Sequence, residues 1–261
     1  MNDVFRIDQM NFSLANEILS SVGDGDRLLK CIQCGTCTGT CPAAGGMERT
    51  PREIARMVQL GLVEEALRSQ VFWNCVGCAS CKLKCPRGVP LADLMTTLRA
   101  EFTRRIGVPE SMAALSDALE RTNNITGDPP ENKLLWLKNM EQPALEGRIG
   151  RGAEVAFFTG CVSSLFPMVY GIPQSFVRIL EASGIEYCVL GSDEWCCGFP
   201  LLAAGMPDKL ERLARHNVET LREMGVRTLV TTCPSCFHTW KWDYLEIVGK
   251  LPFRVLHSSE F

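Results

Sequence analysis

The sequence predicts a helical domain followed by an α/β domain with a parallel sheet. Over residues 1–121, apolar side chains recur at intervals of three and four residues, which is the spacing of one helix face. From residue 153 onward, short β-rich runs alternate with helical patterns, the order typical of a parallel sheet. Residues 122–152 are predicted to link the domains, because both ends of this segment carry Gly, Pro, Asn and charged residues.

Helical patterns account for the first domain. Leu14–Ser20 is predicted to form its first helix. Thr50 and Pro51 are typical of an N-cap and a first helical position, Gly61 ends that helix, and Leu62–Ser69 begins another. A longer amphipathic helix is predicted from the apolar residues Leu91, Leu94, Met95, Leu98 and Phe102.

The second domain alternates strands and helices. The predicted strands are Val155–Gly160, Ile185–Leu190, Val226–Thr231 and Phe253–Leu256. The predicted helices are Ser175–Ala182, Asp208–Met224 and Ser235–Val248. Cys161 and Cys233 each follow a strand, and sites in such sheets lie beyond the carboxyl ends of the strands. We therefore expect these two cysteines to converge at one edge of the sheet.

Eight of the fourteen cysteines form two nearly identical runs. The first run is Cys31-Ile-Gln-Cys34-Gly-Thr-Cys37-Thr-Gly-Thr-Cys41-Pro42, and the second is Cys75-Val-Gly-Cys78-Ala-Ser-Cys81-Lys-Leu-Lys-Cys85-Pro86. Both have the spacing C-x2-C-x2-C-x3-C-P, which binds a pair of [4Fe–4S] clusters. The two runs therefore indicate electron transfer.

In this spacing, the fourth cysteine of each run ligates the other cluster. We assign one cluster to Cys31, Cys34, Cys37 and Cys85. We assign the other cluster to Cys75, Cys78, Cys81 and Cys41. Two alternatives remain open, a pair of zinc sites built from C-x2-C pairs and a disulfide framework. Lys82, Lys84 and Arg87 surround the second run, where positive charge would raise the reduction potential of that cluster; a solvated loop is the alternative.

Composition limits the partners and the compartment. The net charge of −3 gives no strong attraction to nucleic acid or to anionic membranes. The cysteines are clustered at ligand spacings, which indicates metal binding in a reducing compartment. Met1–Asp8 carries acidic residues and no apolar stretch, so we expect no signal peptide and a cytoplasmic protein. The longest apolar run is far too short to span a bilayer, so membrane association is expected only through a partner.

Five more cysteines form a second constellation. They occur as Cys161, as Cys196-Cys197-Gly198 and as Cys233-Pro-Ser-Cys236, and Cys188 is left over as a buried strand thiol. Two adjacent thiolates are unusual for one tetrahedral zinc ion, so five thiolates at three separate loop ends suit a larger cluster better. Gly198 would allow a close backbone approach at this turn. A zinc site with four thiolate ligands and a group of inert buried thiols are the alternatives.

The pattern C…CCG…CxxC resembles the cysteine-rich CCG domain in the B-type subunit of heterodisulfide reductase, and the two cysteine runs resemble its C-type subunit. The chain is thus similar to a fusion of an α-helical dicluster ferredoxin domain (1–121), a linker (122–152) and one α/β CCG domain with a parallel sheet (153–261). The resemblance implies a non-cubane [4Fe–4S] cluster in the CCG domain. Its ligands, which would carry the catalytic role, match Cys161, Cys196, Cys197, Cys233 and Cys236.

The resemblance also implies an electron-transfer role in disulfide and thiol redox chemistry. Electrons would come from a flavin-containing subunit resembling the A-type subunit of heterodisulfide reductase and pass through two cubanes to the CCG cluster. In that family, two CCG domains in tandem reduce the disulfide between their clusters. Because this sequence carries one CCG motif and reaches Phe261 where a second domain would begin, two possibilities are open. Either a second CCG-bearing subunit supplies the other domain, or the single cluster has an electron-transfer or different redox role. The alternatives are a self-sufficient thiol–disulfide reductase formed by homodimerisation, and a pure electron-transfer protein with a structural zinc in its CCG domain.

Overall fold

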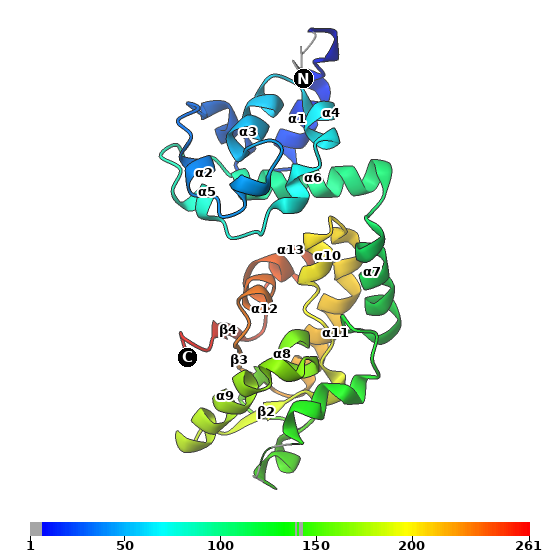
Figure 1. The fold of residues 1–261 in the computed structure, drawn as a ribbon. Coiled ribbons are helices and arrows are strands. Elements are labelled where there is room, and N and C mark those ends of the chain that lie inside the picture. Colours follow the sequence, from blue (N-terminus) through cyan, green and yellow to red (C-terminus); the bar gives the residue numbers. More distant parts are fainter. Residues whose placement is uncertain (1–6, 139, 141–142) are drawn as a thin grey trace. The chain divides into compact units, whose positions relative to one another are not determined.

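The structure, a computed structural model, describes residues 7–138, 140 and 143–261 (Figure 1). These residues divide into two compact units, one within the range 1–108 together with 203–206, and the other within the ranges 109–202 and 207–261. In this division, α7 (Glu110–Thr122) and the segment 122–152 fall within the second unit. No helix among the described residues is both long and apolar enough to cross a membrane.

The first unit is built from helices. Its main helices are α1 (Phe12–Ser20), α3 (Pro51–Gln59), α4 (Val63–Arg68) and α6 (Leu91–Ile106). The short helices α2 (Thr36–Gly39) and α5 (Ser80–Leu83) lie within the two cysteine runs. Short 3-10 segments complete the unit at Ile7–Gln9, Gly25–Lys30, Ala44–Gly46 and Val71–Asn74. The helices predicted over this region are confirmed, with boundaries that differ by a few residues.

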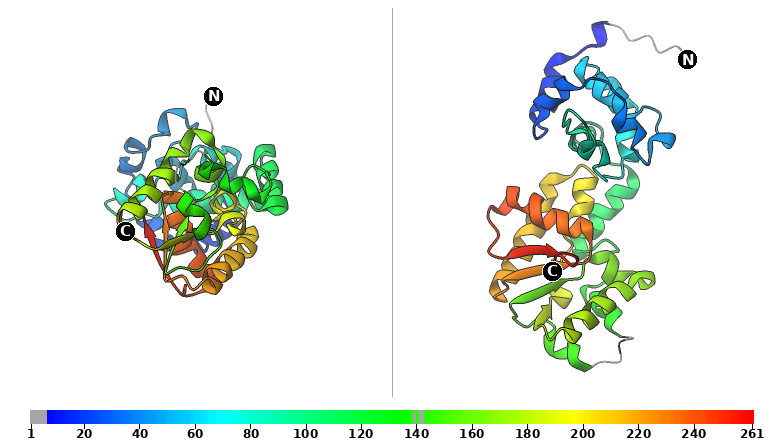
Figure 2. Two further views of the ribbon diagram at one scale, coloured as in Figure 1. Left: turned by 90° about the horizontal axis from the view of Figure 1, so that it is seen from below. Right: turned by 90° about the vertical axis from the view of Figure 1, so that its left-hand side faces the viewer.

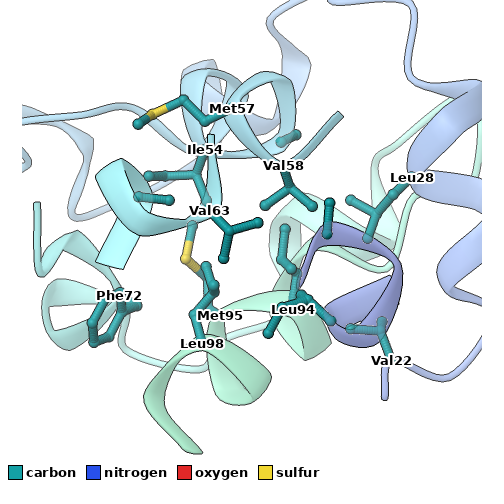
Figure 3. Packing of buried hydrophobic residues seen from close by; sticks show 14 of the residues in the cluster. Val22, Leu28, Ile54, Met57, Val58, Val63, Phe72, Leu94, Met95 and Leu98 are labelled. Carbon is teal, nitrogen blue, oxygen red and sulfur yellow. The ribbon is translucent and has the colours of Figure 1, made fainter. Parts of the chain in front are cut away.

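One apolar core holds these helices together (Figure 3). Leu28, Ile54, Val63 and Leu94 from four separate segments are fully buried in it. Cysteines from both runs pack against the same core: Cys31, Cys37, Cys75, Cys81 and Cys85. The core therefore fixes the positions from which both runs present their thiols.

The start of α3 follows the sequence prediction closely. Thr50 is its N-cap and Pro51 its first residue. The Glu53 amide donates to Thr50 Oγ1 at 3.4 Å, and the Thr50 amide donates to the Glu53 carboxylate at 2.6 Å. This reciprocal capping box satisfies amide donors that the first turn of a helix leaves unpaired.

The second unit contains a four-stranded parallel sheet, as predicted. The strands are β1 (Val155–Phe158), β2 (Tyr187–Val189), β3 (Thr228–Thr231) and β4 (Arg254–His257), in the order β2-β1-β3-β4. In register, Val155 of β1 pairs with Tyr187 on one side and Thr228 on the other. The chain builds β2 on one side of β1 and then β3 on the other. The strand order therefore reverses between β1 and β3, the point at which open parallel sheets bind ligands.

Helical segments cover both faces of this sheet (Figure 2). They comprise α8 (Cys161–Leu165), α9 (Gly171–Ala182), α10 (Phe199–Ala203), α11 (Leu210–Glu223), α12 (Pro234–His238), a π-helical turn (Thr239–Asp243) and α13 (Tyr244–Val248), with 3-10 segments at Pro130–Leu137, Pro143–Arg148, Pro167–Val169, Gly191–Asp193 and Pro207–Lys209. Phe157 packs on Phe176 of α9 at 4.8 Å between ring centroids, whereas its neighbour Phe158 packs on Trp240 at 5.4 Å. Successive strand side chains point to opposite faces, so one strand anchors both layers.

Candidate metal centres

The eight cysteines of the two runs line two cavities in the first unit. The lining of one cavity includes Cys31, Cys34, Cys37 and Cys85. The lining of the other includes Cys75, Cys78, Cys81 and Cys41. Cys81 lines both cavities, so it lies between them. In each cavity, the last cysteine of one run thus lies with the first three cysteines of the other run.

The two runs repeat one backbone conformation. The residues before and after the second cysteine are left-handed in both, with φ of +59° at Gln33 and +84° at Gly35, and +68° at Gly77 and +55° at Ala79. Mixed right- and left-handed residues direct successive amide groups into a concavity, a device found at many iron–sulfur sites. Gln33 and Ala79 adopt this conformation at a cost of about 1–2 kcal/mol each. Other interactions of the loop must therefore offset the unfavourable backbone conformation of these two residues.

Solvent-facing and buried thiols have opposite pKa shifts. Thr36 Oγ1 lies 3.3 Å from Cys34 Sγ, and Ser80 Oγ lies 3.4 Å from Cys78 Sγ; these hydroxyl contacts lower the pKa of both exposed cysteines. At Cys81, burial and then the charge of Cys75 raise the pKa to about 11. Because metal binds the thiolate, cluster insertion at Cys81 must displace a firmly held proton.

The basic residues predicted to surround the second run lie in different places. Lys82 forms an ion pair with Asp93 at 2.6 Å on the surface, and Arg87 lines the cavity of Cys31, Cys34 and Cys37. A buried cation, Arg99 of α6, instead donates to the Phe72 carbonyl at 2.9 and 2.7 Å and to the Cys75 carbonyl. Arg99 was not predicted from the sequence, although its place on the apolar face of α6, four residues after Met95, was a usable signal.

Five cysteines of the second unit converge beyond the carboxyl ends of β1 and β3. Thiol–thiol hydrogen bonds join them in a chain that runs Cys161, Cys196, Cys197, Cys236, Cys233. Four of the five are buried and Cys233 is half-buried. The expected convergence of Cys161 and Cys233 is therefore observed, at the switch point of the sheet. Cys188 lies apart from this group, buried in β2.

Two glycines allow the loops of this thiol group to approach each other. Gly160 has φ +78°, and a Cβ added there would lie 3.1 Å from Cys236 Sγ. Gly198 has φ +86°, and a Cβ there would lie only 2.0 Å from Leu210 Cδ1. A side chain at Gly198 would therefore strain the backbone and require Leu210 of α11 to move. The close backbone approach to a bound group at this turn stays a prediction.

Two buried polar residues hold the Cys196–Cys197 turn in place. Asn217 of α11 donates to the Cys196 carbonyl at 3.1 Å and accepts from the Trp195 amide at 3.1 Å. The Tyr244 hydroxyl donates to the Cys197 carbonyl at 3.0 Å. Neither residue was predicted from the sequence; an asparagine midway between the buried Leu213 and Leu221 was the available signal.

Hydrogen bonding within the thiol group divides its pKa values. A hydrogen bond with Cys236 lowers the pKa of Cys233 to about 6, and hydrogen bonds with Cys196 and Cys236 lower that of Cys197 to about 6. The pKa of Cys236 rises well above its ordinary value because it bonds to Cys197 and Cys233. Thiols with a lowered pKa favour the thiolate, which is the form that binds metal.

The residues around this thiol group suit a polynuclear cluster. Thr232 Oγ1, Thr239 Oγ1 and Trp240 Nε1 are buried without a hydrogen-bond partner among the described residues. These donors flank Cys233 and Cys236 in sequence, and bound sulfide would supply acceptors that buried donors ordinarily have. In the part of the chain that the structure describes, no three Cys, His, Asp or Glu side chains converge on a position for a single metal ion. A cluster accepts wider thiol spacing, because its thiolates ligate different iron atoms.

Comparison with known families matches both halves of the chain. Residues 30–90 match the family described as a 4Fe-4S dicluster domain, and residues 155–241 match the cysteine-rich domain family CCG. The D-type subunit of the dihydromethanophenazine:CoB–CoM heterodisulfide reductase of Methanosarcina barkeri is 28% identical over 258 residues, covering 88% of this chain and 61% of that protein.

Two other relatives show how the similarity is distributed. The C-type iron–sulfur subunit of the CoB–CoM heterodisulfide reductase of Methanopyrus kandleri is 39% identical over 87 residues, covering 32% of this chain and 45% of that protein. An EtfAB:quinone oxidoreductase of Syntrophomonas wolfei is 22% identical, covering 88% of this chain and 38% of that protein. The chain spans less than two thirds of the length of these relatives. It is homologous to the D-type and C-type subunits of heterodisulfide reductases, and it joins a 4Fe-4S dicluster domain to a CCG domain in one polypeptide.

Proposed function

We propose that this chain is the iron–sulfur electron-transfer subunit of a heterodisulfide reductase-like complex, acting in disulfide and thiol redox chemistry. One observation carries the proposal: a single chain holds two cavities lined by the eight cysteines of its two runs and a separate group of five linked thiols. Iron–sulfur clusters bound at these sites supply one-electron transfer. Reduction of a disulfide takes two electrons and two protons and yields two thiols, so one-electron carriers must deliver two successive electrons.

Each thiol group has a proposed ligand role. Cys31, Cys34, Cys37 and Cys85 hold one cubane, and Cys75, Cys78, Cys81 and Cys41 hold the other. Cys161, Cys196, Cys197, Cys233 and Cys236 hold a non-cubane [4Fe–4S] cluster. The cavity linings support the first two sets, and the thiol–thiol hydrogen bonds support the third.

The partners follow from the resemblance. The electron donor is a flavin-containing subunit resembling the A-type subunit of heterodisulfide reductase, and the disulfide site is completed by a second CCG-bearing subunit. The chain acts in the cytoplasm and reaches a membrane only through a partner. The protein's own contribution is to hold the clusters, exclude water and set the surrounding charge. The exclusion of water is supported by Trp240, which follows α12 (Pro234–His238) and packs on Phe158.

Metal analysis of the anaerobically purified chain tests this proposal. The two cubanes account for about eight irons and the CCG site for about four more, and Mössbauer spectra of the reduced and oxidised protein distinguish the cluster types. Stoichiometric zinc with little iron would refute the proposal. About eight irons with one zinc would instead support the pure electron-transfer alternative, and a dimer with reductase activity on gel filtration would support the self-sufficient reductase.

A further inference from the structure

A fully buried ion pair lies beside the five thiols of the second unit. Lys133 and Glu194 each expose only 3% of their surface, and Lys133 Nζ lies 2.9 Å from Glu194 Oε1. The Glu194 carboxylate also accepts the Thr159 amide at 2.7 Å and the Gly160 amide at 2.9 Å. Three donors therefore hold the carboxylate, and the carboxylate in turn fixes the lysine.

The position of this pair ties it to the thiols. Gly160 immediately precedes Cys161, and Glu194 precedes Cys196 by two residues. A single carboxylate thus joins the backbones of two loops that carry thiols. Lys133 comes from the 3-10 segment Pro130–Leu137, within the residues predicted to form a linker. The segment predicted as a linker therefore also supplies a charged group to this site.

The carboxylate of this pair is more fully compensated than the ammonium group. Glu194 accepts two backbone amides, those of Thr159 and Gly160, in addition to Lys133. These amide donors offset part of the negative charge of the carboxylate, so the pair leaves net positive potential at the start of the loop that carries Cys161. Burying an ion pair is expensive unless its surroundings compensate, and a thiolate-rich site provides that compensation.

We propose that Lys133, oriented by Glu194, is a positioning residue that supplies a fixed positive charge to the CCG site and makes its cluster easier to reduce. This inference rests on the proposed function, in that the five cysteines hold an iron–sulfur cluster. Five thiolates make such a cluster anionic, and each added electron makes it more so; a nearby cation stabilises the reduced form. Reduction adds one electron from an external donor, and no bond to Lys133 forms or breaks.

Redox titration of the full chain, followed by EPR under anaerobic conditions, tests the proposal. Reduced viologen supplies the electrons. In Lys133→Gln, the reduced-to-oxidised ratio of the CCG cluster at the wild-type midpoint should fall about tenfold, which is about 59 mV for a one-electron couple. In Lys133→Arg, which keeps the positive charge, the same reduced-to-oxidised ratio should stay within about threefold of the wild-type value. Glu194→Gln should move the midpoint in the opposite direction, which a purely structural pair would not do.

A matched control is Lys209→Gln. Lys209 also pairs with a carboxylate, Glu120 at 2.5 Å, but its side chain is 42% exposed and therefore screened by water. Its loss should leave the CCG midpoint unchanged. The cubane signals in the same samples report whether each variant is otherwise intact.

The outcomes separate this inference from the proposed function. Absence of a CCG cluster in the wild-type chain would overturn both. A wild-type CCG cluster with equal midpoints in wild type, Lys133→Gln and Lys133→Arg would overturn the inference alone. Loss of the CCG cluster in Lys133→Gln but not in Lys133→Arg would support it, because the charge is then needed for assembly. Equal loss in both variants would assign Lys133 a packing role and overturn it.

Discussion

Cys41 and Cys75 belong to different cysteine runs, yet they line the same cavity in the first unit. Cys85 and Cys31 have the reciprocal relationship in the other cavity. Residues 42–74 fold into α3, α4 and short 3-10 turns between the runs, and these elements pack on the core that also contacts the cysteines. The helical insertion thus brings the end of each run to the beginning of the other.

The first prediction concerns this exchange of cysteines. Cys41→Ser should alter the cluster held mainly by Cys75, Cys78 and Cys81, because its thiol lines their cavity. EPR spectra of the reduced variant should match those of Cys75→Ser. If the spectra match those of Cys31→Ser instead, the proposed ligand assignment is wrong.

The second prediction uses the left-handed positions that the two runs share. Ala79→Gly should stabilise the first unit by about 1 kcal/mol, since glycine adopts positive φ without strain. Gly35→Ala should destabilise the unit by about 1 kcal/mol for the same reason. No other group lies within 4 Å of a Cβ at Gly35, so steric clash does not obscure the comparison. Denaturant unfolding of the anaerobic protein measures both effects, and equal signs for the two variants would contradict the strain argument.

The third prediction concerns Arg99, whose guanidinium binds the Phe72 and Cys75 carbonyls. Arg99→Ala should destabilise the first unit by about 3 kcal/mol, because it removes three charge-assisted hydrogen bonds to the Phe72 and Cys75 carbonyls. Arg99→Lys should recover only part of that loss, since one ammonium cannot reproduce the planar fork. Arg68→Ala is the matched control: its side chain is 74% exposed and forms a surface ion pair with Glu65. Equal unfolding free energies for Arg99→Ala and Arg68→Ala would show that Arg99 has no supporting role.

The fourth prediction concerns Asn217, which holds the Cys196–Cys197 turn through its amide group. Asn217→Ala should destabilise the second unit by about 2 kcal/mol and reduce occupancy of the CCG site. Tyr244→Phe, which removes the hydroxyl bound to the Cys197 carbonyl, should have a smaller effect of about 1 kcal/mol. The iron content measures occupancy of the CCG site, and the cubane EPR signals report whether the rest of the chain is intact. Loss of the cubane signals along with the CCG site would indicate general unfolding and not a local role.

The fifth prediction concerns the catalytic competence of the 261-residue chain by itself. It should accept electrons from reduced viologen but show negligible turnover of low-molecular-weight and thiol-cofactor disulfides. Turnover should appear when two partners are added, a flavin-containing one and another that bears a CCG domain. Cys197→Ala should abolish that turnover while leaving both cubane signals intact, because its thiol lies in the other unit. Robust turnover by the purified monomer would refute this division of roles.

Local patterns were sufficient to predict most of the fold. Thr50 and Pro51 mark the start of α3 because capping depends on neighbouring residues alone. The alternation of β-rich and helical runs predicts a parallel sheet because parallel strands need crossover connections. The two cysteine spacings likewise indicate metal sites. Successive cysteines in each run are close in sequence, so local residues decide how near their thiols can lie.

Other features depend on the tertiary structure, because they join residues that are distant in the chain. The strand order β2-β1-β3-β4 decides that Cys161 and Cys233 meet at a switch point. Burial decides that Arg99 rather than the exposed Lys82 contacts the backbone of the second run. The pairing of Lys133 with Glu194, 61 residues apart, has no local signature at all. The sequence alone predicted which thiols group together as candidate metal ligands. The tertiary structure decided which buried charges and donors surround them, since those arise only when separate segments pack together.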